Sequence, residues 1–243
     1  MANPTAAMLV IGDEILSGRT RDANMHLLAQ RLTDAGIELK EAAVVSDAPA
    51  AIVASVNRLR ADHDYVITSG GIGPTHDDIT AENIAAAFGV PIDVRDDARA
   101  ILQQHYEANG IELNDARLRM ARIPDGAELI ANPISAAPGF RIENVFVLAG
   151  VPKIFEAMLA EILPGLAKGE RIHSKTICVE LGEGDIAGPL GAIAARFPDL
   201  SVGSYPFQED GRFGSNLVLR GRDSSRIESA ELALREAFGA HAK

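Results

Sequence analysis

Short apolar runs alternate with stretches of helical spacing through the first part of the chain. The apolar runs have the length and β-branched composition of buried strands, and they lie at 6–11, 39–45 and 65–68. Stretches with apolar residues three and four positions apart predict helices at 22–35, 50–59 and 80–88. Strands that alternate with helices in this way form parallel sheets with right-handed crossovers. The pattern therefore predicts an α/β fold whose ligands bind beyond the carboxyl ends of the strands.

The middle of the chain continues this alternation less regularly. Residues 96–123 have the spacing of a long amphipathic helix, and short strands are predicted at 128–131 and 144–149. Gly150-Val151-Pro152 then opens a helix that we expect to end near Leu163, because proline is favoured in the first helical turn. This region completes a first domain, which we place at residues 1–168.

The last part of the chain, residues 171–243, has a different order of elements. We expect a strand at 175–181, a helix at 185–196, two strands on either side of a turn at 208–211, and a helix at 225–238. This β-α-β-β-α order predicts a small α+β module. A linker rich in proline, glycine and charge, residues 164–170, separates it from the first domain.

A glycine cluster directly after the strand at 65–68 carries the clearest chemical signal. Residues 68–80 have the sequence Thr-Ser-Gly-Gly-Ile-Gly-Pro-Thr-His-Asp-Asp-Ile-Thr. Glycine lets the backbone approach a ligand closely, and the N–H groups at the start of the next helix favour an anion such as phosphate. Asp77 and Asp78 would repel that phosphate unless a divalent cation lies between them, as Mg²⁺ does in phosphate sites. The segment therefore predicts a metal-assisted phosphate site at a strand end.

Acidic residues also follow the first two predicted strands. Gly12-Asp13-Glu14 follows the first strand and Asp47 the second, so both are expected at the same edge of the sheet as the glycine cluster. Structural roles are open as well. Asp78 could cap the helix that follows it, and Asp47 the helix near Pro49. Asn24 could cap its own helix or donate a hydrogen bond across the site.

Composition and charge narrow the possible partners. The chain of 243 residues is 47% hydrophobic and 23% charged, as is usual for a soluble globular protein. Its net charge is −11, and residues 1–170 hold 14 basic and 24 acidic groups, or −10, without the basic stripe that nucleic acid requires. No stretch approaches the roughly 20 apolar residues of a membrane span. We expect a cytoplasmic protein with a small-molecule partner and neither nucleic acid nor membrane.

Cysteine and histidine do not provide an alternative metal centre. Cys178 is the only cysteine, which excludes an intrachain disulfide and a cysteine cluster, and its apolar neighbours predict a buried side chain. The six histidines are scattered without the spacing of zinc ligands.

Residues 68–80 resemble the signature of the molybdopterin-binding (MoaB/Mog-type) domain. The segment 12–16, together with Asn24, is similar to the opening of one branch of that family, the N-terminal part of competence/damage-inducible protein A (CinA). Residues 132–139 and 150–152 also fit this branch, so the resemblance covers about residues 5–168. Residues 185–187 and 203–206 resemble the segment that follows in CinA-like proteins and in eukaryotic FAD synthases.

This resemblance implies a three-layer α/β/α fold with a mostly parallel sheet, a pocket for a pterin or nucleotide phosphate, and a homodimer or homotrimer. In the Mog branch two aspartates serve adenylyl transfer to molybdopterin, and by motif they fall on Asp47 and Asp78. In the CinA branch the domain is associated with metal-dependent hydrolysis of ADP-ribose-type pyrophosphates. The acids expected to hold Mg²⁺, Mn²⁺ or Co²⁺ are Asp13, Glu14, Asp77 and Asp78. The residues expected at the phosphate or the rest of the ligand are Gly12, Asn24, Thr68, Ser69, Gly70, Gly71, Gly73, Pro74, Thr75, Pro138 and Gly139.

Two features depart from the CinA pattern. The chain stops at Lys243, so the C-terminal deamidase domain of full-length CinA is not expected here. The usual Pro-Gly-x-Pro-Ser-Glu-Met becomes Ala149 to Phe155, with Ile154 where the branch has an acid. If that acid positions metal or substrate, its loss weakens catalysis while binding survives.

These observations predict one function and leave two alternatives. The first is a metal-dependent pyrophosphatase acting on a nucleotide such as ADP-ribose or FAD. The second is adenylyl transfer to molybdopterin, which the appended 171–243 module disfavours. The third is a pterin- or nucleotide-binding protein without catalysis, which the departure at Ile154 suggests.

Overall fold

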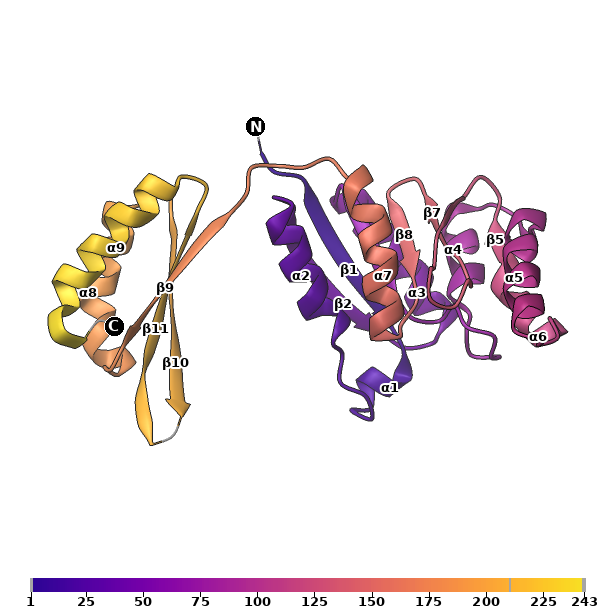
Figure 1. The fold of residues 1–243 in the computed structure, drawn as a ribbon. Helices are drawn as coiled ribbons and strands as arrows, with labels where there is room; N and C mark the ends of the chain where they lie inside the picture. Colours follow the sequence, from indigo (N-terminus) through magenta and orange to yellow (C-terminus); the bar gives the residue numbers. More distant parts are fainter. Residues whose placement is uncertain (1, 210, 242–243) are drawn as a thin grey trace. The chain divides into compact units, whose positions relative to one another are not determined.

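The computed structural model describes residues 2–209 and 211–241 (Figure 1). The chain divides into two compact units, Met1–Gly169 and Glu170–Lys243. None of the helices in the described part of the chain has the length and apolar character that a bilayer crossing requires.

The first unit is built on a six-stranded sheet with the order β2-β1-β3-β8-β7-β6. The strands β2, β1, β3 and β8 are parallel to one another, whereas β7 is antiparallel to its two neighbours, β8 and β6. The predicted, mostly parallel sheet is thereby confirmed. The strands are β1 (Thr5–Ile11), β2 (Glu38–Val45), β3 (Tyr65–Ser69), β6 (Glu128–Ile130), β7 (Gly139–Ile142) and β8 (Val145–Leu148). The sequence analysis missed β7, whose four residues lie between a proline-rich loop and the strand β8.

Helices cover both faces of this sheet, as the three-layer prediction requires (Figure 1). Alternate residues of β1 point to opposite faces, and both sets are buried. Ala7, Leu9 and Ile11 share one apolar cluster with α3, α4 and α5, whereas Met8 and Val10 share another with α2 and α7. These helices are α2 (Asn24–Asp34), α3 (Pro49–Asp62), α4 (Thr80–Phe88), α5 (Asp96–Ala108) and α7 (Pro152–Ile162).

The predicted long helix over 96–123 is wrong in its second half. Helix α5 ends at Ala108, and Gly110 follows with a left-handed φ of 65° that favours glycine. A new short helix, α6 (Asp115–Leu118), begins where the Asn114 side chain accepts a hydrogen bond from the N–H of Arg117. The 3₁₀ turn Arg119–Ala121 and strand β5 (Arg122–Pro124) complete the segment. Strand β5 pairs with β4 (Ile92–Val94) in a two-stranded antiparallel sheet, and it also contacts α4.

The segment Gly12-Asp13-Glu14 lies directly after β1, as predicted. It leads into a one-turn helix that the sequence analysis did not predict, α1 (Asp13–Leu16). Asp13 and Glu14 lie in its first turn, where negative side chains interact favourably with the free N–H groups of a helix N-terminus.

The second unit has the predicted β-α-β-β-α order. Its three-stranded antiparallel sheet has the order β10-β11-β9, and α8 and α9 pack on it through the apolar cluster that includes Ile177, Leu217 and Leu234. Its elements are β9 (His173–Val179), α8 (Glu183–Arg196), β10 (Ser201–Glu209), β11 (Arg212–Gly221) and α9 (Ser224–Phe238). The turn predicted at 208–211 includes Asp210, which lies outside the described residues. Cys178 is free and half-buried rather than fully buried.

Candidate functional site

The residues Gly70, Gly71, Ile72 and Gly73, here called the glycine loop, leave the end of β3 in a conformation that requires glycine. Gly70 and Gly71 have φ values of 108° and 69°, which other residues rarely adopt. A Cβ atom on Gly70 would lie 2.3 Å from the carbonyl oxygen of Ile11, and one on Gly71 would lie 2.2 Å from Oγ1 of Thr80. The two glycines therefore let β3 pass close to β1 and to the first turn of α4.

Hydrogen bonds to α4 and β8 hold the start of this loop, and the N–H of Gly70 donates to the carbonyl of Leu148 at 3.3 Å. Thr80 donates from its hydroxyl to the carbonyl of Gly70 and from its N–H to the carbonyl of Gly71, both at 2.9 Å. The N–H groups of Gly71, Ile72 and Gly73 find no acceptor among residues 2–209 and 211–241. Successive unpaired N–H groups after a strand form a binding site for an anion such as phosphate. The loop thus has the donors that the sequence analysis expected.

One hollow lies beside Gly70 and is organised by Asn24. This hollow, here called the asparagine side, is lined by residues that include Glu14, Asp22, Asn24, Ser69, Gly70 and Gly150. Asn24 is 4% exposed and donates from Nδ2 to Oγ of Ser69 at 2.8 Å and to the carbonyl of Gly150 at 2.7 Å. It therefore connects the start of α2, the end of β3 and the β8–α7 loop across the site. Among residues 2–209 and 211–241, its buried Oδ1 atom has no hydrogen-bond partner, and neither has Oγ1 of the fully buried Thr68.

Asp47 and the acids after β1 form a separate arrangement. The carboxylate of Asp47 accepts a hydrogen bond of 2.9 Å from the N–H of Asp13, at the start of α1. Helix α3, which Asp47 could have capped, begins after Ala48 without a side-chain cap. The Glu14 carboxylate folds over Gly12, where a Cβ atom would meet Oε2 at 2.5 Å. Glu14 lines the asparagine side, whereas Asp13 and Asp47 line neither hollow described here.

A second hollow lies beside Gly71 and Gly73. This hollow, here called the arginine side, is lined by residues that include Gly71, Gly73, Asp78, Glu82, Arg119, Arg122 and Pro138. Oδ2 of Asp78 accepts hydrogen bonds from the N–H of Thr75, at 2.8 Å, and from the Thr75 hydroxyl. Helix α4 has Ile79 before its first turn and no side-chain cap, so Asp78 closes the loop rather than the helix. Its second oxygen, Oδ1, has no hydrogen bond within the described chain.

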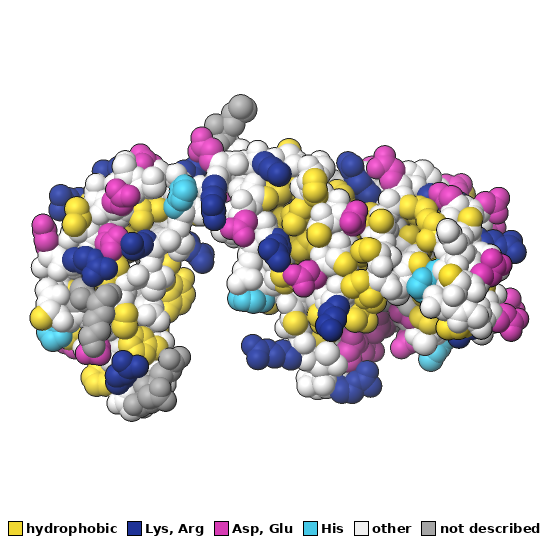
Figure 2. Space-filling view, in the orientation of Figure 1, with side chains coloured by type: hydrophobic (Ala, Val, Ile, Leu, Met, Phe, Trp, Pro, Cys, Tyr) yellow, Lys and Arg dark blue, Asp and Glu magenta, His cyan; other side chains and the backbone are white. Residues whose placement is uncertain are grey.

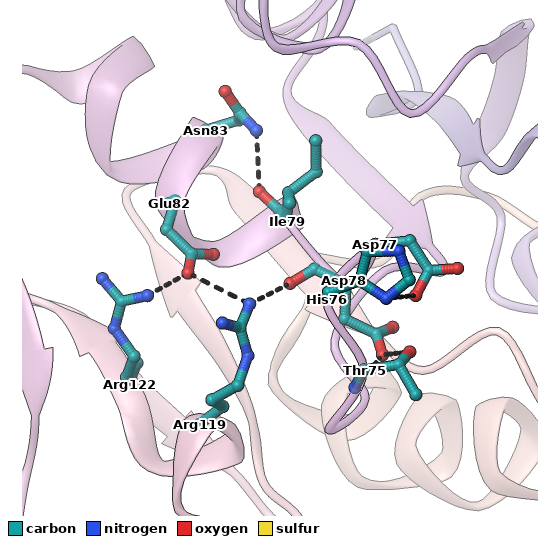
Figure 3. A network of polar contacts seen from close by, with 9 residues as sticks. All are labelled: Thr75, His76, Asp77, Asp78, Ile79, Glu82, Asn83, Arg119 and Arg122. Carbon is teal, nitrogen blue, oxygen red and sulfur yellow. Dashed lines mark hydrogen bonds and ion pairs between the residues drawn. The ribbon is translucent and has the colours of Figure 1, made fainter. Parts of the chain in front are cut away.

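The side chains of the neighbouring Asp77 and His76 face each other beside this turn (Figure 3). The His76 side chain is 98% exposed and lies 3.8 Å from Oδ1 of Asp77. The pKa of the Asp77 carboxyl is lowered, first by the Thr75 hydroxyl, then by its own backbone N–H, with smaller effects of His76 and Arg19. The Thr75 hydroxyl donates to Asp78 in this structure, so it lies within reach of both carboxylates. Asp77 is therefore an accessible carboxylate, expected to be ionised near neutral pH.

Glu82, Arg119 and Arg122 are site residues that the sequence analysis missed. Both arginines point to the Glu82 carboxylate, and Arg119 also points to the carbonyl oxygen of Asp78 (Figure 3). These three side chains are 30–36% exposed. The missed signal was the break at Asn109-Gly110, which places the two arginines beside the first turn of α4. Elsewhere, on the face that Figure 2 shows, basic side chains are interspersed with acidic ones.

The remaining predicted residues fall into two groups. Pro74 and Thr75 are exposed in the loop before α4. Gly139 starts β7, where a Cβ atom would lie 2.3 Å from the carbonyl oxygen of Val147, so its role is close packing against β8. Ile154, at the position of the missing acid, is half-buried in the first turn of α7 and packs against the same apolar cluster as Ile72.

The four acids predicted to hold a metal are thus spread over different parts of the site. Within the described residues, no group of three or more histidine, cysteine or acidic side chains is arranged to hold a metal ion. Asp78 nevertheless has a free oxygen at the glycine loop. Mg²⁺ is commonly held by one or two carboxylates together with the phosphates of a substrate. The donor set therefore fits a metal that binds with a phosphorylated ligand better than a resident metal.

Comparison with known proteins identifies the family of each part of the chain. Residues 7–168 match the family described as probable molybdopterin binding domain, and residues 171–242 match the FAD synthase, middle domain. The chain is 34% identical to a probable FAD synthase of Caenorhabditis briggsae, covering 98% of this chain and 50% of that protein. It is 37% identical to a CinA-like protein of Myxococcus xanthus, covering 76% and 48%. The chain thus spans about half the length of these curated relatives.

A solved structure supports the fold assignment. The protein CinA from Thermoplasma acidophilum, a protein of unknown function, superposes with a TM-score of 0.62 and 33% identity. The match covers 68% of this chain and 99% of that one. The resemblance to CinA found in the sequence is thereby confirmed. The chain belongs to the family of the probable molybdopterin-binding domain, in a CinA-like form followed by a domain like the middle domain of FAD synthase.

Proposed function

We propose that this protein hydrolyses the pyrophosphate bond of a nucleotide such as ADP-ribose or FAD, with a divalent metal ion. The observation that carries the proposal is the row of N–H groups at Gly71, Ile72 and Gly73, unpaired within the described residues, which share one hollow with the free carboxylate oxygen of Asp78 and the guanidinium of Arg119. Backbone donors and a cation match the oxygens of a diphosphate. The carboxylate matches a metal ion or an attacking water.

Each group has a distinct task in this proposal. The glycine loop binds phosphate oxygens, and the closed Thr75–Asp78 turn keeps the Asp78 carboxylate beside them. Asp78 would hold Mg²⁺, Mn²⁺ or Co²⁺ together with the phosphates of the ligand. A bound ion would polarise a phosphoryl oxygen and make its water more acidic. Asp78 also lies where it can orient a water molecule, because its Oδ1 atom is not used within the described chain.

The second unit favours a nucleotide ligand of the FAD type. It matches the middle domain of FAD synthase over residues 171–242, and a relative that covers nearly the whole chain is named a probable FAD synthase. That name describes a transferase, so adenylyl transfer with Asp47 and Asp78 remains the second candidate, with molybdopterin as the possible acceptor. The apolar environment of Ile154 favours the third candidate, ligand binding without turnover.

Turnover by the full chain tests the first candidate. Purified protein incubated with each of the three metals is expected to hydrolyse ADP-ribose to AMP and ribose 5-phosphate, or FAD to AMP and FMN, with one water consumed per bond cleaved. Asp78→Asn should lower kcat/KM by about a hundredfold, the scale of a lost proton-transfer or metal-positioning group. Asp125→Asn, which changes an exposed aspartate outside both hollows, is the matched control and should change little.

The outcomes separate the three candidates. AMP transfer from ATP to molybdopterin, abolished by Asp78→Asn, would favour adenylyl transfer. Micromolar binding by calorimetry without any product would favour a binding protein. Folded wild-type protein that cleaves no dinucleotide with any of these metals would rule out the pyrophosphatase.

A further inference from the structure

The guanidinium of Arg119 is poorly satisfied by its own protein. Its Nε atom is buried and has no hydrogen-bond partner within the described residues. Its Nη2 atom lies 3.4 Å from the carbonyl oxygen of Asp78 and 3.8 Å from Oε1 of Glu82, both long for hydrogen bonds. A guanidinium has five donors, and leaving a buried donor unpaired is costly. Arg119 therefore has unused donors inside the arginine side.

The backbone around Arg119 fixes this position. Arg119 begins the 3₁₀ turn that joins α6 to β5, and the carbonyl of Ala121 at its end accepts a hydrogen bond of 2.9 Å from the N–H of Arg95. Strand β5 is paired with β4 and packs beside α4. The neighbouring Arg122 is paired with Glu82. The fold of the whole segment therefore places Arg119 in the hollow, where its guanidinium has no short hydrogen bond to any described residue.

The free donors of the hollow indicate the kind of ligand that would satisfy Arg119. Glu82 and Asp78 balance the formal charges of Arg119 and Arg122, so an anion would be bound by the free donors and not by an excess of positive charge. Arginine binds phosphate through two parallel N–H donors, a geometry that its planar group fits well. The unpaired N–H groups of the glycine loop line the same hollow.

We infer that Arg119 binds a phosphate group of the nucleotide ligand through Nε and Nη2, while Glu82 and Arg122 hold its guanidinium beside the glycine loop. The inference rests on the proposed function for the identity of the ligand as a nucleotide diphosphate. It assigns Arg119 a role in binding the anion and none in the transfer of a proton. Its effect should therefore be seen in affinity and KM before kcat.

A purely structural role for Arg119 makes a different prediction. If Arg119 only links the 3₁₀ turn to Glu82, its removal lowers stability and leaves phosphate binding unchanged in the protein that remains folded. The two roles separate when the same variants are measured with charged and uncharged ligands.

Calorimetry on the full chain, without metal, tests the inference with inorganic pyrophosphate, ADP and adenosine. Arg119→Met should weaken pyrophosphate and ADP by about ten- to a hundredfold, the scale of a lost charge-assisted hydrogen bond, and leave adenosine unchanged. Arg119→Lys keeps the positive charge but not the two parallel N–H donors, so it should retain part of the affinity that Arg119→Met loses. Arg117→Met is the matched control, since Arg117 stacks on Tyr106 and donates to the carbonyl of Glu112 outside the hollow.

Each result decides for or against Arg119 separately from the pyrophosphatase. Loss of pyrophosphate affinity in Arg119→Met supports the inference even if the wild type cleaves no dinucleotide. Equal affinity of wild type and Arg119→Met for pyrophosphate overturns it even if the wild type is an active hydrolase. Wild-type protein that binds neither pyrophosphate nor ADP, or an equal loss in Arg117→Met, also overturns it.

Discussion

The two sides of the glycine loop differ in how firmly hydrogen bonds connect the segments that line them. On the asparagine side, Asn24 is almost fully buried and makes two short hydrogen bonds to other segments of the chain. On the arginine side, Arg119 and Glu82 are about one-third exposed, and Arg119 makes only long contacts. One side is cross-linked by hydrogen bonds, and the other keeps charged groups available.

The free groups on the two sides also have opposite character. The asparagine side leaves an acceptor unpaired, Oδ1 of Asn24, close to the carboxylates of Glu14 and Asp22, with Arg21 as a cation at its edge. The arginine side leaves donors unpaired, Nε of Arg119 and the N–H groups of the glycine loop. Acceptors match the hydroxyl groups of a ligand and donors match its phosphates. The glycine loop therefore separates the asparagine side, whose hydrogen bonds fix the backbone of the loop, from the arginine side, whose free donors suit an anion.

The strongest way to break this arrangement is to add a methyl group at its centre. Gly70→Ala should destabilise the protein by about 3–5 kcal/mol, because it combines a left-handed φ with a Cβ atom 2.3 Å from the Ile11 carbonyl. Gly126→Ala is the matched control, since Gly126 has a φ of 78° but open space around it, and should cost about 1 kcal/mol. Urea unfolding measures both. Equal losses would show that strain alone, and not the approach of β3 to β1, requires glycine.

A smaller effect is expected from Asn24. Asn24→Ala removes two buried hydrogen bonds between α2, β3 and the β8–α7 loop and should lower the free energy of unfolding by about 1–3 kcal/mol. Asn83→Ala is the control, because Asn83 is equally buried but bonds only the Ile79 carbonyl next to its own helix. Ligand affinity should fall together with stability in Asn24→Ala, whereas Arg119→Met should change affinity alone. A loss of affinity without a loss of stability in Asn24→Ala would contradict the division between the two sides.

The sheet and its layers were predictable because burial leaves a regular pattern. β1 is apolar and buried from Ala6 to Ile11 because both faces are covered, and the helices α2 and α3 carry apolar residues at helical spacing. Strands β4 and β5 have three residues each, too few to show a period. The amphipathic spacing of α5 continued by chance past Gly110, so the sequence predicted one long helix there.

The site was predictable only where local chemistry marks it. The glycines at 70, 71 and 73 and Asp78 could be found because a turn at a strand end imposes those residue types. Arg119 and Glu82 lie 37 positions apart in sequence, and only the pairing of β4 with β5 brings their segments together. The hydrogen bond that Asp47 accepts from the N–H of Asp13 depends on α1. This helix has four residues, too few to show a periodic pattern in the sequence. Contacts that depend on short elements were therefore missed.

The smallest expected effect concerns how Thr75 serves the two adjacent acids on the arginine side. The Thr75 hydroxyl is the main cause of the lowered pKa of Asp77, although in this structure it donates to Asp78. Thr75→Val should therefore raise the pKa of Asp77 towards the ordinary value of an aspartate and change stability by less than about 0.5 kcal/mol, since the loop is exposed. Thr75→Ser keeps the hydroxyl and should keep the low pKa. Carbon-detected NMR titration of the carboxyl groups measures both variants. If Asp77 titrates unchanged in Thr75→Val, the hydroxyl serves Asp78 alone, and the arginine side is organised around a single carboxylate.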